Sequence, residues 1–295
     1  MNETSATRHR GEMAYPAEIP GTVDCVYKTI GSIELKLWFF LPWGHRPDDR
    51  RAAALFFFGG IWEGGSPRHF RRHAAYLAER GMVGVVADFR VTKRHDCTVI
   101  ESLRDARSAI RWLRAHAAEY GIDPSRIAVG GGSSGGHLAA LTATHAHLDE
   151  AEEEPHSVSA MPDALLLFNP FLVLDDVPDR FTFADPGLGL REKMRLEELR
   201  TVSPYHRLRP GLPPTLILHG MKDDIAPYET IALFKEAMDR HGNRCELIAY
   251  EQHGHRFFNY GFFDNAPFYD TLAWMDRFLI SLKFLRGPGR RVRHP

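Results

Sequence analysis

One serine in the sequence lies in a setting that would expose its hydroxyl group for nucleophilic attack. The run from Gly130 to His137 joins an apolar segment that ends at Val129 to a helix-like stretch. A Gly-x-Ser-x-Gly turn between a strand and a helix holds its serine in a strained conformation, and the glycines remove Cβ atoms that would collide. The first N–H groups of the helix would then face the negative charge that develops on a substrate oxygen. The run predicts a nucleophile on a turn.

Two registers of this motif are possible, because Ser133 and Ser134 are each the centre of a Gly-x-Ser-x-Gly match. We favour Ser133, since a helix that starts near Gly135 needs the nucleophile at the tip of the turn, directly after the strand. The backbone N–H of Ser134 would then donate to the developing oxyanion. An isolated match also fits a glycine-rich turn without chemistry. The remaining sequence therefore has to supply a base and an acid.

A base and an acid follow in the order expected for such a sheet, in which serine, aspartate and histidine come from successive strand ends. Asp223 comes shortly after an apolar run that begins at Thr215, and His255 lies on the loop after the last run. A serine hydroxyl needs a base to take its proton, and the base needs a carboxylate to orient it. We therefore predict Ser133, Asp223 and His255 as a catalytic triad.

Each partner has a competitor nearby in the sequence. Asp224 is the alternative acid, although an aspartate at a helix start more often serves as a cap. His253 is the alternative base, but His255 follows a glycine that would let the loop approach the serine. His137 and His219 are expected to be buried histidines that hold loops.

The oxyanion formed during acyl transfer needs two or three N–H donors fixed in advance, and losing one costs about 3 kcal/mol. Besides Ser134, the glycine-rich turn after the third apolar run is expected to supply them. Gly60 and Ile61 are the candidate donors in this turn, and Trp62 is a candidate wall of an acyl pocket.

Eight apolar runs are predicted to be strands: Val23 to Ile30, Glu34 to Leu41, Ala52 to Phe58, Met82 to Ala87, Arg126 to Gly130, Ala164 to Phe168, Thr215 to His219 and Glu246 to Tyr250. Helical spacing of apolar residues predicts five helices: Pro67 to Arg80, Glu101 to Tyr120, Gly136 to His147, Pro227 to Arg240 and Thr271 to Leu285. The first two strands form a hairpin, and strands and helices alternate from the third strand onward. The fold class is therefore α/β, with an eight-stranded, mostly parallel sheet covered by helices on both faces.

The length of 295 residues is consistent with one catalytic domain, which we expect over residues 21–285. Residues 1–20 form an N-terminal extension and residues 286–295 a basic, solvated C-terminal tail. A long segment follows the sixth strand, and we expect it to be a lid insertion over about residues 171–207, with a solvated helix within it.

The composition excludes several classes of partner. A formal net charge of −1 provides no field that would attract nucleic acid or an anionic membrane. The three cysteines are too far apart for a zinc site or a disulfide scaffold, and the proposed chemistry needs no metal or organic cofactor. With no apolar leader and no membrane-spanning run, we expect a soluble cytoplasmic protein, or a secreted one if a leader was removed. Whether it is a monomer or a homodimer stays open.

With these residues in place, the chain resembles the α/β-hydrolase superfamily from about Val23 to Leu285. It is most similar to esterases and lipases related to bifunctional feruloyl and acetyl xylan esterases and to hormone-sensitive-lipase-like carboxylesterases. The resemblance rests on five motifs: Phe58 to Trp62, Asp123 to Val129, Gly131 to His137, His219-Gly220 with Asp223, and Gly254-His255. The family implies the same triad of Ser133, Asp223 and His255.

Three positions depart from the family pattern. Phe58 stands where a histidine usually precedes the glycines, Ile61 where a third glycine is common, and Ser134 where alanine is commoner. The resemblance implies a serine carboxylesterase for short acyl groups, with acetyl esters of carbohydrates as candidates. The alternatives are a serine peptidase of the prolyl-oligopeptidase type, for which the N-terminal propeller domain is missing, and a non-catalytic binding protein, which the altered turn would suit.

Overall fold

The computed structural model describes residues 19–145 and 157–287. Residues 1–18 of the predicted extension and residues 288–295 of the predicted basic tail lie outside the described residues.

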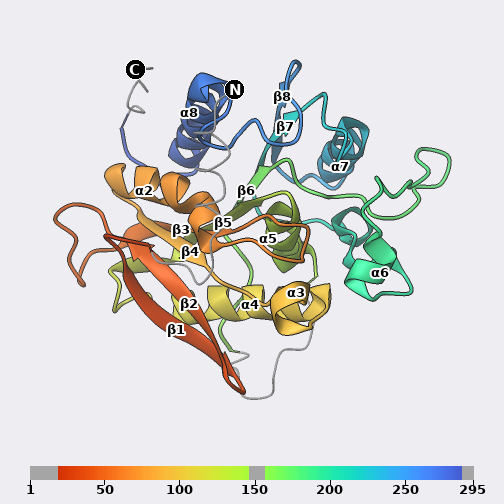
Figure 1. Ribbon diagram of the computed structural model, residues 1–295. Coiled ribbons are helices and arrows are strands. Elements are labelled where there is room, and N and C mark those ends of the chain that lie inside the picture. Colours follow the sequence, from red (N-terminus) through yellow and green to blue (C-terminus); the bar gives the residue numbers. More distant parts are fainter. Residues whose placement is uncertain (1–18, 146–156, 288–295) are drawn as a thin grey trace, which may run out of the picture.

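The described part of the chain forms one eight-stranded sheet in the order β1-β2-β4-β3-β5-β6-β7-β8 (Figure 1). The strands are β1 Val23–Ile30, β2 Ile33–Phe40, β3 Arg51–Phe57, β4 Val83–Ala87, β5 Ile122–Gly132, β6 Ala164–Phe168, β7 Thr215–Gly220 and β8 Cys245–Tyr250. β1 pairs with β2 and β2 with β4 in antiparallel fashion, and all pairs from β4 to β8 are parallel. All eight predicted strands and the predicted hairpin are confirmed.

Helices cover both faces of the sheet. They are α2 Arg71–Glu79, α3 Thr92–His95, α4 Val99–Ala115, α5 Ser134–Thr144, α6 Leu190–Met194, α7 Tyr228–Arg240 and α8 Ala266–Ser281, with short 3₁₀ turns η1 Pro67–Phe70, η2 Leu199–Val202, η3 Pro204–Arg207 and η4 Phe263–Asn265. Figure 1 shows α2 and α8 on one side of the sheet, and α4 and α5 on the other.

β3 shows how one strand supplies both layers of the core. Successive side chains of a strand point to opposite faces. Ala53, Leu55 and Phe57 accordingly pack in the cluster that contains the buried residues of α4, α5 and α7. Ala54 and Phe56 pack in the second cluster, with α2 and α8. A strand buried on both faces must be apolar throughout, which is why these strands read as continuous apolar runs.

Several predicted helices have different bounds in the structure. The helix predicted over Gly136 to His147 is α5, Ser134–Thr144, and His147 lies outside the described residues. For two others the local sequence explains the start. α4 was predicted over Glu101 to Tyr120 but begins at Val99, after a capping box in which the backbone N–H of Thr98 donates to the Glu101 carboxylate at 2.6 Å. α8 begins at Ala266 instead of Thr271, since Pro267 has a φ angle suited to the first turn of a helix.

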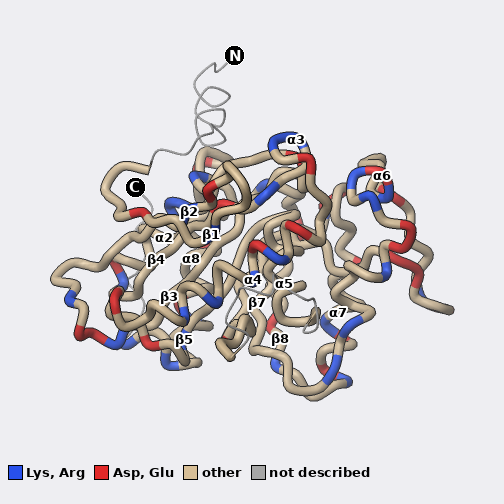
Figure 2. Tube along the Cα trace, turned by 90° about the horizontal axis from the view of Figure 1, so that it is seen from below, with Lys and Arg blue, Asp and Glu red and all other residues tan. Residues whose placement is uncertain are grey.

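The segment between β6 and β7 holds α6, η2 and η3. Leu190 and Met194 of α6 are fully buried, whereas Arg191 and Glu192 between them are exposed. Figure 2 shows the Lys, Arg, Asp and Glu positions that gather on and around α6. The predicted solvated helix is therefore a single short helix with one buried edge. That the segment acts as a lid stays a prediction.

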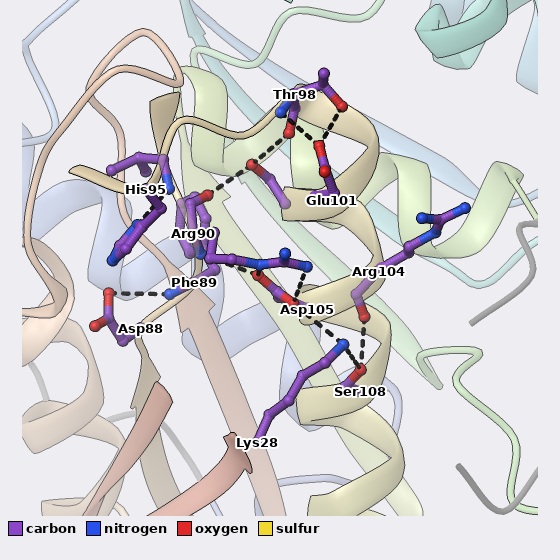
Figure 3. A network of polar contacts seen from close by, with 12 residues as sticks. Lys28, Asp88, Phe89, Arg90, His95, Thr98, Glu101, Arg104, Asp105 and Ser108 are labelled. Carbon is purple, nitrogen blue, oxygen red and sulfur yellow. Dashed lines mark hydrogen bonds and ion pairs between the residues drawn. The ribbon is translucent and has the colours of Figure 1, made fainter. Parts of the chain in front are cut away.

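A buried network of ion pairs fastens α4 to the sheet (Figure 3). Asp105 on α4 is fully buried, and Arg90, just after β4, donates to both of its oxygens from Nε at 2.7 Å and Nη2 at 2.9 Å. Lys28 of β1 lies 3.1 Å from the same carboxylate. A single carboxylate thus joins an edge strand, a strand end and a helix.

We predict that Asp105→Ala lowers the free energy of unfolding by about 3–5 kcal/mol, because it removes the buried carboxylate that pairs with two largely buried cations. Chemical denaturation measures the change. Asp24→Ala is the matched control, since Asp24 pairs with Lys36 where both side chains are at least 40% exposed, and should cost at most about 1 kcal/mol. An equal loss of free energy of unfolding in the two variants would contradict the stabilising role of Asp105.

His73 on α2 is buried in an aromatic cluster with Phe70 and Phe168 at ring distances of 4.7 and 5.1 Å. Among the described residues, no hydrogen-bond partner reaches either ring nitrogen. Burial lowers the pKa of His73 from 6.5 to about 3. The folded protein therefore keeps this ring neutral at a pH where the unfolded chain takes up a proton.

His73 is consequently predicted to make folding stability depend on pH. Its stabilising contribution is complete above pH 6.5 and decreases as the pH falls toward 3, by up to about 1.4 kcal/mol per pH unit. His73→Phe keeps an aromatic ring without a titratable group. Its free energy of unfolding, relative to that of the wild type, should therefore rise as the pH falls from 7 to 4. Denaturation at several pH values measures this difference, and a constant difference would argue against it.

Candidate active site

The turn after β5 holds Ser133 in a strained backbone conformation, with φ 55° and ψ −125°. The strands approach so closely here that a Cβ atom on Gly131 would lie 2.6 Å, and one on Gly135 2.3 Å, from the carbonyl oxygen of Phe57. The Ser133 N–H donates to the Phe168 carbonyl of β6 at 2.9 Å. Ser133, not Ser134, is the residue at the tip of the turn.

His255 connects the predicted nucleophile to the predicted acid. Its Nε2 lies 2.8 Å from Ser133 Oγ, and its Nδ1 lies 2.8 Å from Asp223 Oδ2. The three side chains come from loops that follow β5, β7 and β8, whose carboxyl ends meet at one edge of the sheet. The structure therefore brings together all three residues that the sequence predicted.

The loop after β7 holds Asp223 as a carboxylate. One oxygen accepts the backbone N–H groups of Ile225 and Ala226, both at 2.9 Å, and the other accepts the Asn169 side-chain amide. Burial alone would raise the pKa of Asp223, but the hydrogen bonds from His255 and the Ala226 N–H outweigh burial and lower it. The competing acid, Asp224, is exposed.

His253, the competing base, packs away from the serine. Its ring stacks on Phe257 at 5.6 Å and lies edge-on to Phe263 at 4.9 Å. Its carbonyl oxygen accepts the Lys222 N–H at 3.0 Å, which closes the loop next to Gly220.

The two other histidines are buried, as predicted. His219 donates from Nε2 to the Ala226 carbonyl at 2.8 Å, and burial lowers its pKa to about 4. His137 accepts the indole N–H of Trp62 at 3.1 Å and donates to the Val202 carbonyl at 2.7 Å. Burial also lowers the pKa of His137 to about 4, so both rings are neutral.

The same contact corrects the prediction for Trp62. Its side chain is 1% exposed, packs 5.1 Å from the Phe171 ring and is not among the described residues that line the cavity at Ser133. Trp62 instead anchors the turn after β3 to α5 through His137. The aromatic wall that the structure places at this cavity is Phe258.

The turn after β3 brings the predicted oxyanion donors beside Ser133. Gly60 and Ile61 line the same cavity as Ser133, and Ile61 has a left-handed φ of 55°. The Gly60 N–H, however, donates to the side-chain Oγ of Ser134 at 3.0 Å. In this structure Gly60 is therefore engaged by the residue that replaces the commoner alanine, a contact that sequence reasoning missed.

His69 is a further residue at the site that sequence reasoning missed. Its Nδ1 accepts the Gly59 N–H at 3.1 Å, so its Nε2 carries the proton and faces Asn259 Oδ1 at 2.6 Å. Asn259 lies four residues after His255. His69 thus joins the glycine-rich turn after β3, which holds the predicted oxyanion donors and is called the oxyanion turn below, to the loop of the predicted base. Only its place in η1, just after the glycine-rich turn, could have indicated this role.

The cavity at Ser133 has a volume of about 190 Å³. Its apolar side is formed by Phe258, Ile225 after β7, and Leu188 from the segment between β6 and β7. His255 and Arg256 lie beside them, and none of the described lining residues is acidic. Such a small apolar cavity suits a short acyl group better than a long one.

Two searches of the described residues bear on other site types. They contain no group of three or more His, Cys, Asp or Glu side chains arranged to hold a metal ion. Nor do residues 19–145 and 157–287 include a helix with the length and apolar character needed to cross a bilayer.

Sequence comparison matches residues 45–238, more than half of the 295-residue chain, to the BD-FAE family. Esterase LipC of Mycobacterium tuberculosis is 31% identical over 193 residues, which are 62% of this chain and 47% of that protein. The chain spans less than half the length of the first two curated relatives that it matches.

Solved structures extend the similarity to the whole fold. Esterase 2 of Thermogutta terrifontis with propionate bound is 47% identical, with a TM-score of 0.87 over 94% of this chain and 100% of that one. The same esterase phosphonylated by sarin is 47% identical, with a TM-score of 0.89 over 93% and 100% of the two chains. The predicted α/β-hydrolase fold is confirmed, and the chain belongs to the BD-FAE family of α/β-hydrolase esterases.

Proposed function

We propose that this protein is a serine carboxylesterase that hydrolyses short acyl esters, with Ser133 as nucleophile, His255 as base and Asp223 as its orienting acid. The observation that carries the proposal is the continuous chain of hydrogen bonds from Ser133 Oγ through His255 to Asp223, with both distances at 2.8 Å. Such a chain gives a serine hydroxyl the base that it needs at neutral pH.

The reaction begins when Ser133 Oγ attacks the ester carbonyl carbon and its proton passes to His255 Nε2. Asp223 accepts the hydrogen bond from Nδ1 and stabilises the imidazolium ion that forms. The tetrahedral intermediate then breaks its bond to the alcohol oxygen, which takes the proton from His255. Water, deprotonated by the same imidazole, attacks the acyl-enzyme and releases the acid and Ser133.

The backbone N–H groups of Ile61 and Ser134 are our proposed oxyanion donors. Both belong to turns beside Ser133, and the described residues accept no hydrogen bond from Ile61 N–H. Gly60, predicted as a donor from the sequence, already donates to Ser134 Oγ. We therefore assign Gly60 the task of fixing the turn, with Ile61 and Ser134 facing the oxyanion.

The short acyl preference is supported by the cavity of about 190 Å³ and by Thermogutta terrifontis esterase 2, which has been solved with propionate and with butyrate bound. The same relative is phosphonylated by sarin, as expected of an activated serine. Acetyl esters of carbohydrates are the finer substrate that we propose, on the resemblance of the sequence alone.

The first test compares hydrolysis of p-nitrophenyl acetate, butyrate and octanoate by the wild type and by Ser133→Ala. Loss of the nucleophile should lower kcat by at least about 10⁴-fold, and the wild type should prefer the two shorter esters. Ser134→Ala is the matched comparison. It keeps the backbone N–H but removes the Oγ that accepts the Gly60 N–H, so kcat should fall by at most about tenfold, far less than in Ser133→Ala.

Two results would count against the proposal. Residual activity in Ser133→Ala equal to that of the wild type would exclude Ser133 as nucleophile. An inert but folded wild type would favour a binding protein, and cleavage of peptide p-nitroanilides in preference to esters would favour a peptidase.

His69 is predicted to act as a positioning residue for the oxyanion turn. His69→Ala removes the acceptor of the Gly59 N–H, at a cost of about 1.4 kcal/mol, so kcat should fall about tenfold with little change in KM. His69→Gln keeps a side-chain acceptor and should recover part of kcat. Steady-state kinetics on p-nitrophenyl butyrate measures both values; an unchanged kcat in His69→Ala would disprove the role.

A further inference from the structure

A second cavity, with a volume of about 310 Å³, lies near the amino ends of β3 and β5, whereas Ser133 follows the carboxyl end of β5. Its lining includes Arg51 at the start of β3, Gly81 just before β4 and Arg126 near the start of β5. Arg126 and Ser133 are separated by most of β5, or about 20 Å at roughly 3.3 Å per residue. The proposed reaction makes no use of this cavity.

Five of the residues that line this cavity are arginines: Arg50, Arg51, Arg80, Arg126 and Arg286. Among the described residues that line it, only Asp49 is acidic. Guanidinium groups repel one another unless carboxylates or bound anions lie between them. So many arginines around one concavity therefore need an explanation.

Neighbouring carboxylates orient four of these arginines. Arg51 donates from Nε to Asp49 at 2.6 Å, and its Nη1 donates to the Gly81 carbonyl at 3.1 Å. Arg126 donates from Nε to Asp123 at 3.0 Å, from Nη1 to the Lys283 carbonyl at 3.2 Å and from Nη2 to the Arg50 carbonyl at 2.5 Å. Arg50 Nη2 lies 3.3 Å from the same Asp123 carboxylate.

Arg80, the fourth, donates from Nε to Asp276 at 2.9 Å. These bonds fix the side chains. A guanidinium carries five N–H groups, and Arg51 keeps both N–H groups of its Nη2 free of any contact among the described residues.

The charges around the cavity do not balance. Four of the five guanidinium groups are paired with three carboxylates, those of Asp49, Asp123 and Asp276. Arg50 shares Asp123 with Arg126 and is 72% exposed, and within the described residues no carboxylate pairs with the exposed Arg286. The local excess of two positive charges matches an anion with two negative charges.

We propose that this arginine cavity, formed by the five arginines above, binds a small dianionic oxyanion of the phosphate class. A phosphate group carries nearly two negative charges at neutral pH and accepts several N–H donors at once. The planar guanidinium group of arginine matches the geometry of phosphate, because two of its parallel N–H groups can donate to two phosphate oxygens. The unbalanced positive charge comes from Arg50 and Arg286. Arg51 and Arg126, whose side chains are held by the contacts above, line the cavity.

Isothermal titration calorimetry with inorganic phosphate, and with pyrophosphate as a second probe, tests the proposal at constant ionic strength. The titration uses protein whose Ser133 has been labelled with a fluorophosphonate, which blocks the esterase cavity. The double variant Arg50→Gln/Arg286→Gln replaces two exposed side chains and should bind at least about tenfold more weakly than the wild type.

The matched control is Arg195→Gln/Arg240→Gln, which removes the same two charges from exposed ion pairs elsewhere on the surface. It should bind phosphate as the wild type does. Absence of binding to the wild type, equal weakening in both double variants, or the same heat from sodium chloride would overturn the site. Thermal melting without anion checks that each variant is folded.

Discussion

The whole site depends on the close approach of two backbones where β3 and β5 end. The Phe57 carbonyl lies so near Gly131 and Gly135 that neither position has room for a Cβ atom. This contact holds Ser133 at positive φ, and it also brings the turn after β3 beside the start of α5. The chain leaves β3 toward β4 and leaves β5 toward β6, in opposite directions along the sheet. The crevice between β3 and β5 is therefore the topological switch point at which parallel sheets bind ligands.

Neutral histidines then stabilise the loops that this contact brings together. His69 links the oxyanion turn to the loop of His255, and His137 links Trp62 to α5 and to the segment after β6. His219 holds the loop of Asp223. Because a neutral imidazole both donates and accepts one hydrogen bond, the rings of His69 and His137 each join two segments without burying a charge. The proposed catalytic groups are thus held by neutral partners.

The sequence predicted the sheet and the positions of Ser133, Asp223 and His255. Apolar strand runs, and the residues that follow each strand, can be recognised from short stretches of sequence. β1 and β6 even have the predicted ends. The contacts that it missed join distant residues: His69 and Asn259 are 190 positions apart, and Trp62 and His137 are 75 apart. Trp62 was misjudged because an aromatic residue beside a glycine turn looks the same whether it faces a cavity or the core. The arginine cavity went unrecognised because its residues come from four separate segments.

Peptide mapping by mass spectrometry after reaction with a fluorophosphonate tests the central claim most directly. The account predicts one covalent adduct per chain, located on Ser133, with much slower labelling in His255→Ala, because the base that activates the hydroxyl is then missing. An adduct on Ser134 or on another residue would contradict the assignment, as would a rate of labelling that is unchanged by the loss of His255.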